Sequence, residues 1–192
     1  MPTRNELLYL CGLQDTTACR RPILLEVPTP VLHVILYQPE IPPNTGNIIR
    51  LCANSGATLH LIEPLGFELD NARVKRAGLD YHELARVRRH RDWATFLELF
   101  CAQQSGGRIW AFSTHGTRRY DTVTYRPGDA MMFGPESRGL PAEVMSEAAR
   151  TTGSEATLRL PMMPSNRSLN LSNAVAIGLY EALRQTSFQG LT

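Results

Sequence analysis

Residues 31–63 read VLHVILYQPEIPPNTGNIIRLCANSGATLHLIE, and this stretch decides the fold. VLHVILY is a continuous apolar run typical of a buried strand, and PPNTGN at 42–47 predicts a turn. Residues 48–55 repeat apolar side chains at helical spacing, and Gly56 predicts the end of that helix. TLHLIE at 58–63 predicts a second strand. A strand, a helix and a further strand in succession indicate a parallel strand pair joined by a crossover helix.

The same alternation of strands and helices continues to the C-terminus. Further strands are expected over residues 85–90, 108–114, 129–134 and 156–161. Further helices are expected over residues 71–77, 93–103, 141–149 and 171–184. This order predicts the α/β class, with a mostly parallel sheet and helices on both of its faces. Ligands of such sheets bind in the loops at the carboxyl ends of the strands.

The composition of the 192-residue chain, 43% hydrophobic and 20% charged, is that of one folded domain and excludes a disordered or collagen-like chain. We place this domain at residues 31–192 and treat the proline-containing residues 1–30 as an N-terminal extension of unknown role. No secretory signal or membrane-spanning apolar run is visible, so we expect a cytoplasmic protein without a membrane partner. The four cysteines lack metal-ligand spacing, so no metal is expected.

The formal net charge is only +2, but the type of cation is informative, because Lys75 is the one lysine and arginine supplies almost all of the positive charge. The planar guanidinium of arginine suits bidentate contacts with phosphate. A genome rich in G and C would favour arginine without any such role, so composition alone leaves both explanations open.

The first of three polar loops, PPNTGNIIR at 42–50, joins a strand to the N-terminus of a helix, which is an anion-binding geometry. Asn44 or Thr45 is expected to cap this helix, and Arg50 follows roughly two turns later. When this loop is considered alone, a capped helix with a solvated arginine is the better explanation.

The second loop, FGPESRGLP at 133–141, follows an apolar strand directly. Gly134 and Gly139 permit close backbone approach or unusual torsion angles, and Glu136 and Arg138 place opposite charges beside that backbone. A turn with a surface ion pair is the structural alternative.

The third loop, LPMMPSNRSLNLSNA at 160–174, is a long polar segment before the last helix. Ser172 or Asn173 is expected to cap that helix, but capping accounts for only one or two of the serines and asparagines in the loop.

In this order, N-x-G-N-x-x-R, FGPExxGLP, and LPM followed by SxNxSNA resemble the motifs of the SPOUT superfamily of RNA methyltransferases. Two longer segments, LYQPEIPPNTGNIIRLCANSGATLHLIEPLGF and NLSNAVAIGLYEA, are similar to the tRNA wobble-nucleotide 2′-O-methyltransferases of that superfamily. The resemblance runs from Val31 to Gln185. It implies a SPOUT fold with a C-terminal deep trefoil knot, a homodimer, and S-adenosylmethionine bound in the knot, without a metal.

Positions that match the family motifs imply a cofactor site and a catalytic group. The implied cofactor contacts are Phe112, Gly134, Leu160 and Ser168. The implied catalytic residues are Asn44, Arg50, Glu136, Ser168 and Asn170. In-line transfer of a methyl group from a sulfonium to a ribose 2′-hydroxyl requires alignment and stabilisation of charge on the oxygen. We expect Arg50 to stabilise that charge or to bind the adjacent phosphate rather than to accept the proton, because a guanidinium is not normally deprotonated in proteins.

The resemblance also implies that the RNA partner is tRNA, bound through its anticodon stem-loop on the dimer surface. The expected substrates are leucine tRNAs, methylated at nucleotide 34, which is a cytidine or a modified uridine. The expected RNA contacts are Arg138, Arg167, Arg76 and Lys75. Additional candidates for phosphate contact are Arg73, Arg88, Arg89, Arg91, Arg118 and Arg119.

Other functions stay open at this point. The target could be another tRNA position or ribosomal RNA, and the chain could be an RNA-binding module that keeps the fold without the activity. A nucleotide-dependent oxidoreductase is disfavoured, because the GxGxxG fingerprint of dinucleotide-binding folds is absent from the sequence.

Overall fold

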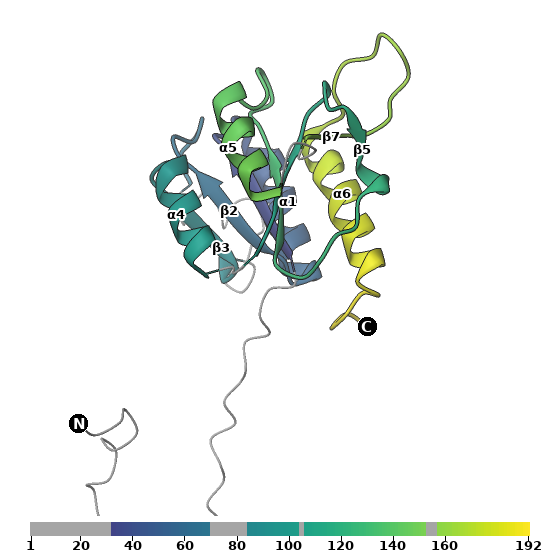
Figure 1. The fold of residues 1–192 in the computed structure, drawn as a ribbon. Coiled ribbons are helices and arrows are strands. Elements are labelled where there is room, and N and C mark those ends of the chain that lie inside the picture. The colour runs from purple at the N-terminus through teal and green to yellow at the C-terminus, as the bar shows by residue number, and fades with distance from the viewer. Residues whose placement is uncertain (1–31, 70–83, 104–105, 153–156) are drawn as a thin grey trace, which may run out of the picture.

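The structure, a computed structural model, describes residues 32–69, 84–103, 106–152 and 157–192 (Figure 1). These residues form a seven-stranded sheet in the order β3-β2-β1-β6-β4-β7-β5, and each neighbouring pair of strands is parallel. The strands are β1 (Leu32–Tyr37), β2 (Thr58–Ile62), β3 (Val87–His90), β4 (Ile109–Phe112), β5 (Arg118–Arg119), β6 (Asp129–Phe133) and β7 (Thr157–Arg159). The helices are α1 (Pro42–Ser55), α4 (Trp93–Gln103), α5 (Ala142–Thr152) and α6 (Leu171–Gln185), with a 3-10 turn η1 (Tyr120–Thr122).

Most of the expected elements are confirmed. The expected strands at 58–63, 108–114 and 129–134 correspond to β2, β4 and β6, and the expected helix at 93–103 is α4. The short strand β5 and the turn η1 were not expected, because their polar residues carry no apolar periodicity. The expected helix at 71–77 lies outside the described residues.

The start of α1 corrects the prediction of a turn at PPNTGN. The helix begins at Pro42, and its N-cap is Ile41, which makes no side-chain capping hydrogen bond. Proline fits this position because its fixed φ suits the first helical turn, where its missing N–H would have no partner within the helix. The prediction that Asn44 or Thr45 caps the helix is therefore wrong, since both residues lie inside the first turns and are buried. Gly56, at φ 72°, ends the helix as expected.

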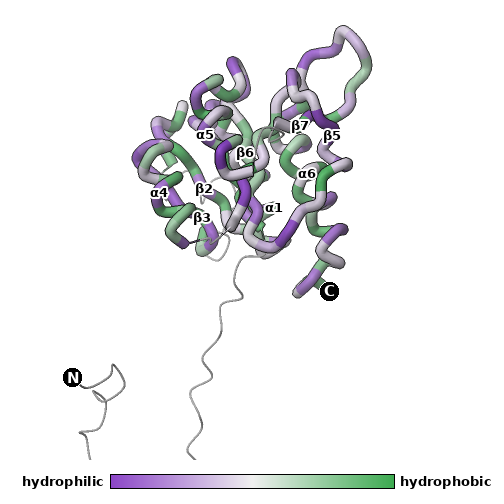
Figure 2. The backbone as a smooth tube through the Cα atoms, in the orientation of Figure 1, coloured by the Kyte–Doolittle hydropathy of each residue, from purple (hydrophilic) through white to green (hydrophobic). Residues whose placement is uncertain are grey.

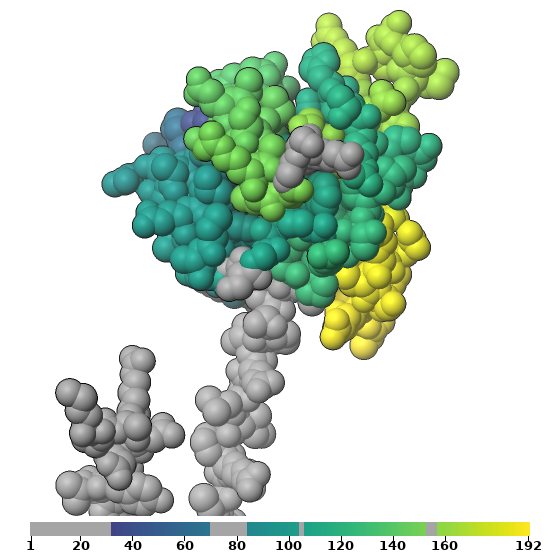
Figure 3. All heavy atoms as spheres, viewed as in Figure 1, coloured from purple at the N-terminus to yellow at the C-terminus, as the bar shows by residue number. Residues whose placement is uncertain are grey.

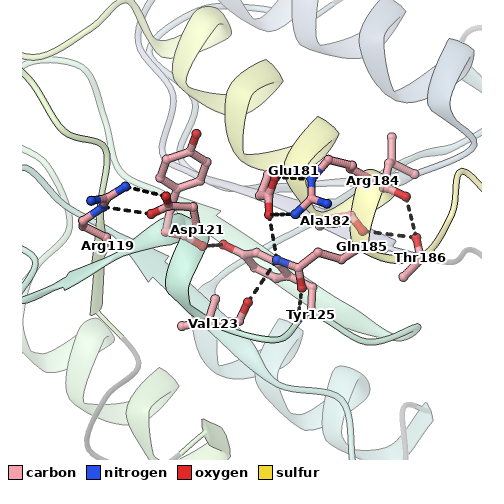
Figure 4. Close-up of polar contacts among 11 residues, drawn as sticks. Arg119, Asp121, Val123, Tyr125, Glu181, Ala182, Arg184, Gln185 and Thr186 are labelled. Carbon is pink, nitrogen blue, oxygen red and sulfur yellow. Dashed lines mark hydrogen bonds and ion pairs between the residues drawn. The ribbon is translucent and has the colours of Figure 1, made fainter.

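The start of α6 corrects a second capping prediction. Asn170, and not Ser172 or Asn173, is the N-cap, and its Oδ1 accepts hydrogen bonds from the backbone N–H groups of both of those residues. The far end of α6 is tied to the segment after β5 (Figure 4). Gln185 there donates from Nε2 to the carbonyl of Val123 at 3.0 Å and accepts from the N–H of Tyr125 at 2.9 Å.

Helices cover both faces of the sheet, as predicted. Side chains such as Val34 and Leu36 of β1 pack in one apolar cluster with α1 and α6, whereas Ile35 packs on the opposite face with α4 and α5. In Figure 2, both α4 and α6 carry apolar and polar residues, as expected for helices with one buried face. Among the described residues, no helix is long and apolar enough to cross a membrane.

Four polar loops emerge together at the carboxyl ends of β1, β6, β4 and β7, because these strands are neighbours in the sheet and run in parallel. The loop after β6 is tightly folded, since a Cβ atom on Gly134 would lie 2.4 Å from the backbone of Gly139, which itself has φ +71°. Both glycine expectations are thus confirmed. The loop between β7 and α6, at residues 160–170, projects from the body of the molecule (yellow-green in Figure 3). The knot stays a prediction of the resemblance.

Candidate active site

A cavity of about 600 Å³ opens where these loops meet. It is lined by residues of the loops after β1, β4, β6 and β7, by α5, and by the starts of α1 and α6. Eight of the predicted site residues line it: Asn44, Phe112, Gly134, Glu136, Arg138, Leu160, Ser168 and Asn170. Its volume and its mixture of apolar walls with a few polar groups are typical of small-molecule sites.

A series of hydrogen bonds runs along the edge of the cavity and connects the three polar segments identified in the sequence. Asn44 donates from Nδ2 to Oε1 of Glu136 at 2.9 Å. Asn170 donates from its own Nδ2 to Oδ1 of Asn44, also at 2.9 Å. The second carboxylate oxygen of Glu136 accepts from the main-chain N–H of Glu40 at 2.9 Å. The three segments that are far apart in the sequence therefore converge on one site.

These hydrogen bonds fix the orientation of the side-chain amides of Asn44 and Asn170. A carboxylate only accepts hydrogen bonds, so Asn44 must turn its NH₂ group toward Glu136 and its oxygen toward Asn170. Asn170 then turns its oxygen toward the N-terminus of α6, where it caps the helix. Asn44 is only 6% exposed, so its rotamer is also confined by packing. The result is a preorganised row of polar groups beside the cavity.

An apolar wall adjoins this polar row. Phe112 stacks on Phe133 with ring centroids 4.6 Å apart, and Phe112 also meets the backbone of Gly178 on α6, where a Cβ atom would lie 3.0 Å from its ring. Phe112 is buried among the core residues, so it serves the core as well as the cavity. Leu160 is half-buried and Ser168 is exposed at the rim. A flat heterocycle could rest against this wall with its polar edges near the loop backbone.

Arg50 does not line this cavity, although it is a predicted catalytic residue. It lies on an exposed part of α1, six residues after Asn44. A helix turns by about 100° per residue, so six residues carry the side chain to a different side of the helix. The structure thus brings together Asn44, Glu136, Ser168 and Asn170 and leaves Arg50 outside the cavity of its own chain.

The predicted RNA contacts separate into three groups. Arg138 lies at the cavity, whereas Arg167 is exposed on the projecting loop and does not line the cavity. Arg73, Lys75 and Arg76 lie outside the described residues. Of the remaining arginines, Arg89, Arg91 and Arg119 form exposed ion pairs with Glu63, Asp92 and Asp121.

Sequence reasoning missed several residues at the cavity. Ser113, Thr114 and His115 follow β4 and line it, and Ser137 lines it beside Glu136. Glu40, which follows β1, binds Ser137 through its side chain, and these hydrogen bonds hold the pKa of the Glu40 carboxyl below its usual value. The signal that could have found them is the switch from apolar to polar residues at the end of each parallel strand. No group of three His, Cys, Asp or Glu side chains suited to a metal occurs among the residues that the structure describes.

Known proteins with similar sequences include tRNA methyltransferases. The chain is 54% identical over 160 residues to the tRNA (cytidine(34)-2'-O)-methyltransferase of Methylovorus glucosotrophus, with 83% of this chain and 99% of the relative covered.

Among solved structures, one that concerns 2-OH methylation of C/U34 on tRNA matches with a TM-score of 0.69 and 49% identity, covering 81% of this chain and 91% of its own. The SpoU methyltransferase AviRb from Streptomyces viridochromogenes, in complex with the cofactor AdoMet, matches with a TM-score of 0.66 and 25% identity, covering 81% of this chain and 57% of its own. The family model of the SpoU rRNA Methylase family matches residues 31–180, and the chain belongs to that family.

Proposed function

We propose that this protein transfers the methyl group of S-adenosylmethionine to the ribose 2′-hydroxyl of nucleotide 34 of tRNA. The nucleotide is a cytidine or a modified uridine, and leucine tRNAs are the substrates. The observation that carries the proposal is the hydrogen-bonded row Glu136–Asn44–Asn170 at the edge of one cavity. The relative from Methylovorus, which carries the name of this activity, supports the same choice of substrate.

The cavity fits a nucleoside-containing cofactor. Its volume of about 600 Å³ and the stacked pair Phe112 and Phe133 suit an adenine ring. Phe112, Gly134, Leu160 and Ser168 would hold S-adenosylmethionine, with the loop backbone near Gly134 and Leu160 reading its polar edges. Bound there, the sulfonium supplies an activated methyl group and a good leaving group.

The polar row positions the acceptor hydroxyl. Asn44 and Asn170 offer amide groups whose orientation is already fixed, and Glu136 offers a carboxylate that accepts hydrogen bonds. Ser168, exposed at the rim, adds a hydroxyl that can donate or accept. Groups that are held before the substrate arrives lower the barrier, because they need no reorganisation when charge develops on the oxygen.

The proposed functional unit is a homodimer. Helix α1 packs against α6, and the C-terminal part of the chain from α6 onward exposes the large apolar side chains Ile177, Tyr180 and Phe188. A second copy placed on this face would bury them. Arg50 lies on the neighbouring helix α1 and outside the cavity of its own chain, so we propose that it acts at the cavity of the partner copy. There it stabilises the developing charge on the oxygen or binds the phosphate beside it.

The test uses tritiated S-adenosylmethionine with total unmodified tRNA, followed by mapping of the labelled nucleotide. The proposal expects label on the ribose of nucleotide 34, enriched in leucine tRNAs. Parallel reactions contain ribosomal RNA, because the family that matches the chain is described as an rRNA methylase family. Label in ribosomal RNA alone overturns the choice of tRNA, and label at another tRNA nucleotide overturns the choice of position. Bound RNA without any label would favour a non-catalytic binding module.

A further inference from the structure

The loops that follow β1, β2 and β6 contact one another around Glu40. On one side, the N–H of Gln38 donates to the carbonyl of Ile62 at 3.0 Å, and the N–H of Gly66 donates to the carbonyl of Pro39 at 2.9 Å. Gly66 approaches so closely that a Cβ atom on it would lie 2.9 Å from Cα of Glu40. The backbone of Glu40 is therefore braced by the loop that follows β2.

On its other side, Glu40 contacts three consecutive residues of the loop after β6. Its main-chain N–H donates to Glu136, as described above. Its carboxylate accepts from the N–H of Ser137 at 3.0 Å and from the Ser137 hydroxyl at 2.8 Å. The same carboxylate forms an ion pair with Arg138 at 3.5 Å, and Arg138 also donates to the side-chain oxygen of Gln38 at 2.8 Å.

The residues that Glu40 contacts, Glu136, Ser137 and Arg138, belong to the candidate site. Glu136 starts the polar row, and Ser137 and Arg138 both line the cavity. The Arg138 side chain is 58% exposed, so its ion pair with Glu40 contributes little to stability. The effect of the pair is to keep the guanidinium group of Arg138 near the cavity. The hydrogen bonds from Ser137 stabilise the ionised carboxylate of Glu40 and lower its pKa.

We propose that Glu40 is a positioning residue for methyl transfer. It fixes the segment 136–138, so that Glu136 meets Asn44 in the reactive arrangement and Arg138 stays at the cavity. Glu40 acts through these neighbours and does not itself line the cavity. This inference rests on the proposed function and adds a residue whose role lies in geometry.

The experiment compares Glu40→Ala and Glu40→Gln with the matched control Glu98→Gln, which makes the same neutralisation at an exposed position of α4 outside the cavity. Three quantities are measured for each full-length protein. They are kcat and KM for tRNA at saturating S-adenosylmethionine, the affinity for S-adenosylhomocysteine by calorimetry, and amide hydrogen exchange at residues 136–139.

Glu40→Ala removes every side-chain contact, so we expect kcat to fall about tenfold and KM for tRNA to rise, with an S-adenosylhomocysteine affinity within about threefold of the wild type. Glu40→Gln retains an oxygen that can accept from Ser137 but loses the attraction to Arg138. It should recover most of kcat while KM for tRNA stays raised. Exchange at 136–139 should accelerate in Glu40→Ala and should not change in Glu98→Gln.

Kinetic constants of Glu40→Ala within twofold of the wild type would overturn the proposal. So would a loss of kcat that disappears once the rate is divided by the concentration of sites that bind S-adenosylhomocysteine, because that pattern indicates only a misfolded fraction. If the wild-type protein methylates no RNA, the proposed function fails separately. In that case, faster exchange at 136–139 in Glu40→Ala still supports the positioning of the loop by Glu40, and unchanged exchange overturns it.

Discussion

Asn44 and Glu136, which lie 92 positions apart in the chain, share a hydrogen bond of 2.9 Å at the edge of the cavity. The bond joins the first turn of α1 to the loop after β6. Its direction, from amide to carboxylate, fixes the orientation of Asn44 and through it that of Asn170. A substitution of Asn44 or of Glu136 should therefore change the orientation of the other side chains in the polar row.

Glu136→Gln should lower kcat by about 100-fold with little effect on cofactor binding. The glutamine oxygen can accept from Asn44 or from the N–H of Glu40, but its NH₂ group then faces a second donor. The amide of Asn44 loses its fixed orientation as a result. Single-turnover methyl transfer measures the chemical step, and calorimetry with S-adenosylhomocysteine measures binding. A kcat that changes as little as in Glu98→Gln would contradict a role of Glu136 in the reaction.

The convergence of these residues could be predicted from the sequence because it follows from the sheet. Apolar runs identified β1 and β6 as buried strands, and parallel strands direct their carboxyl-terminal loops to one edge. The hydrogen bonds could not be predicted, since residue spacing does not say how loops fold against each other. Glu40 was missed for that reason. It lies in the short segment between β1 and α1, and its side chain contacts Ser137, which is 97 positions later in the sequence.

One local prediction was wrong for a physical reason. Pro42 and Pro43 suit both a turn and the first turn of a helix, and only the structure distinguishes these uses. The catalytic role of Arg50 stays a prediction, because helical geometry places Arg50 on a different side of α1 from Asn44 and outside the cavity of its own chain. The role proposed for Arg50 requires a second copy of the chain, so Arg50 is the most direct subject for a test of the dimer.

Mixed dimers should reveal whether Arg50 serves the partner's cavity. Arg50→Ala and Asn170→Ala are each expected to abolish most activity when they are present in both subunits. A dimer with one subunit of each kind would contain one damaged site, lacking both groups, and one intact site. Co-expression with two affinity tags isolates the mixed dimer, and its kcat per dimer should be about half that of the wild type. A mixed dimer as inactive as its parents would contradict action across the interface.

Acidification should destabilise the fold through a row of three histidines on β1, β2 and β3, of which His33 and His60 are buried. His33 Nδ1 lies 3.0 Å from His60 Nε2, and His60 Nδ1 lies 2.9 Å from His90 Nε2. Burial, with a smaller contribution from Arg88, lowers the pKa of His33 from 6.5 to about 4. Burial is also the main cause that lowers the pKa of His60, to about 2, followed by repulsion from His33, His90 and Arg88.

Acid destabilises the folded protein because the unfolded chain takes up more protons. Below pH 6.5 the unfolded chain binds protons that the folded chain does not, so the free energy of unfolding decreases as the pH falls toward 4. His33 alone contributes a loss on the order of 3 kcal/mol over this range. Urea unfolding at several pH values measures it. The dependence of the free energy of unfolding on pH should be weaker in His33→Gln. It should be the same as in the wild type in His115→Gln, which replaces an exposed histidine. Equal slopes in the wild type and in His33→Gln would contradict the assignment.

Gly134 and Gly139 should respond differently to the same substitution, although both belong to the loop after β6. A methyl group on Gly134 would lie 2.4 Å from backbone atoms of Gly139 and Leu140, which cannot move aside as a flexible side chain could. Gly134→Ala is therefore expected to lower the free energy of unfolding by about 3 kcal/mol.

The matched control, Gly139→Ala, meets open space, and its cost comes only from φ +71°. That cost should be about 1 kcal/mol. Because displacement of Gly139 and Leu140 also deforms the cavity wall, Gly134→Ala should weaken S-adenosylhomocysteine binding more than Gly139→Ala does. Urea unfolding and calorimetry on the two variants check both expectations. Equal losses at the two positions would mean that the loop can relax around a Cβ atom on Gly134, so that the close packing of its backbone does not hold the cavity in shape.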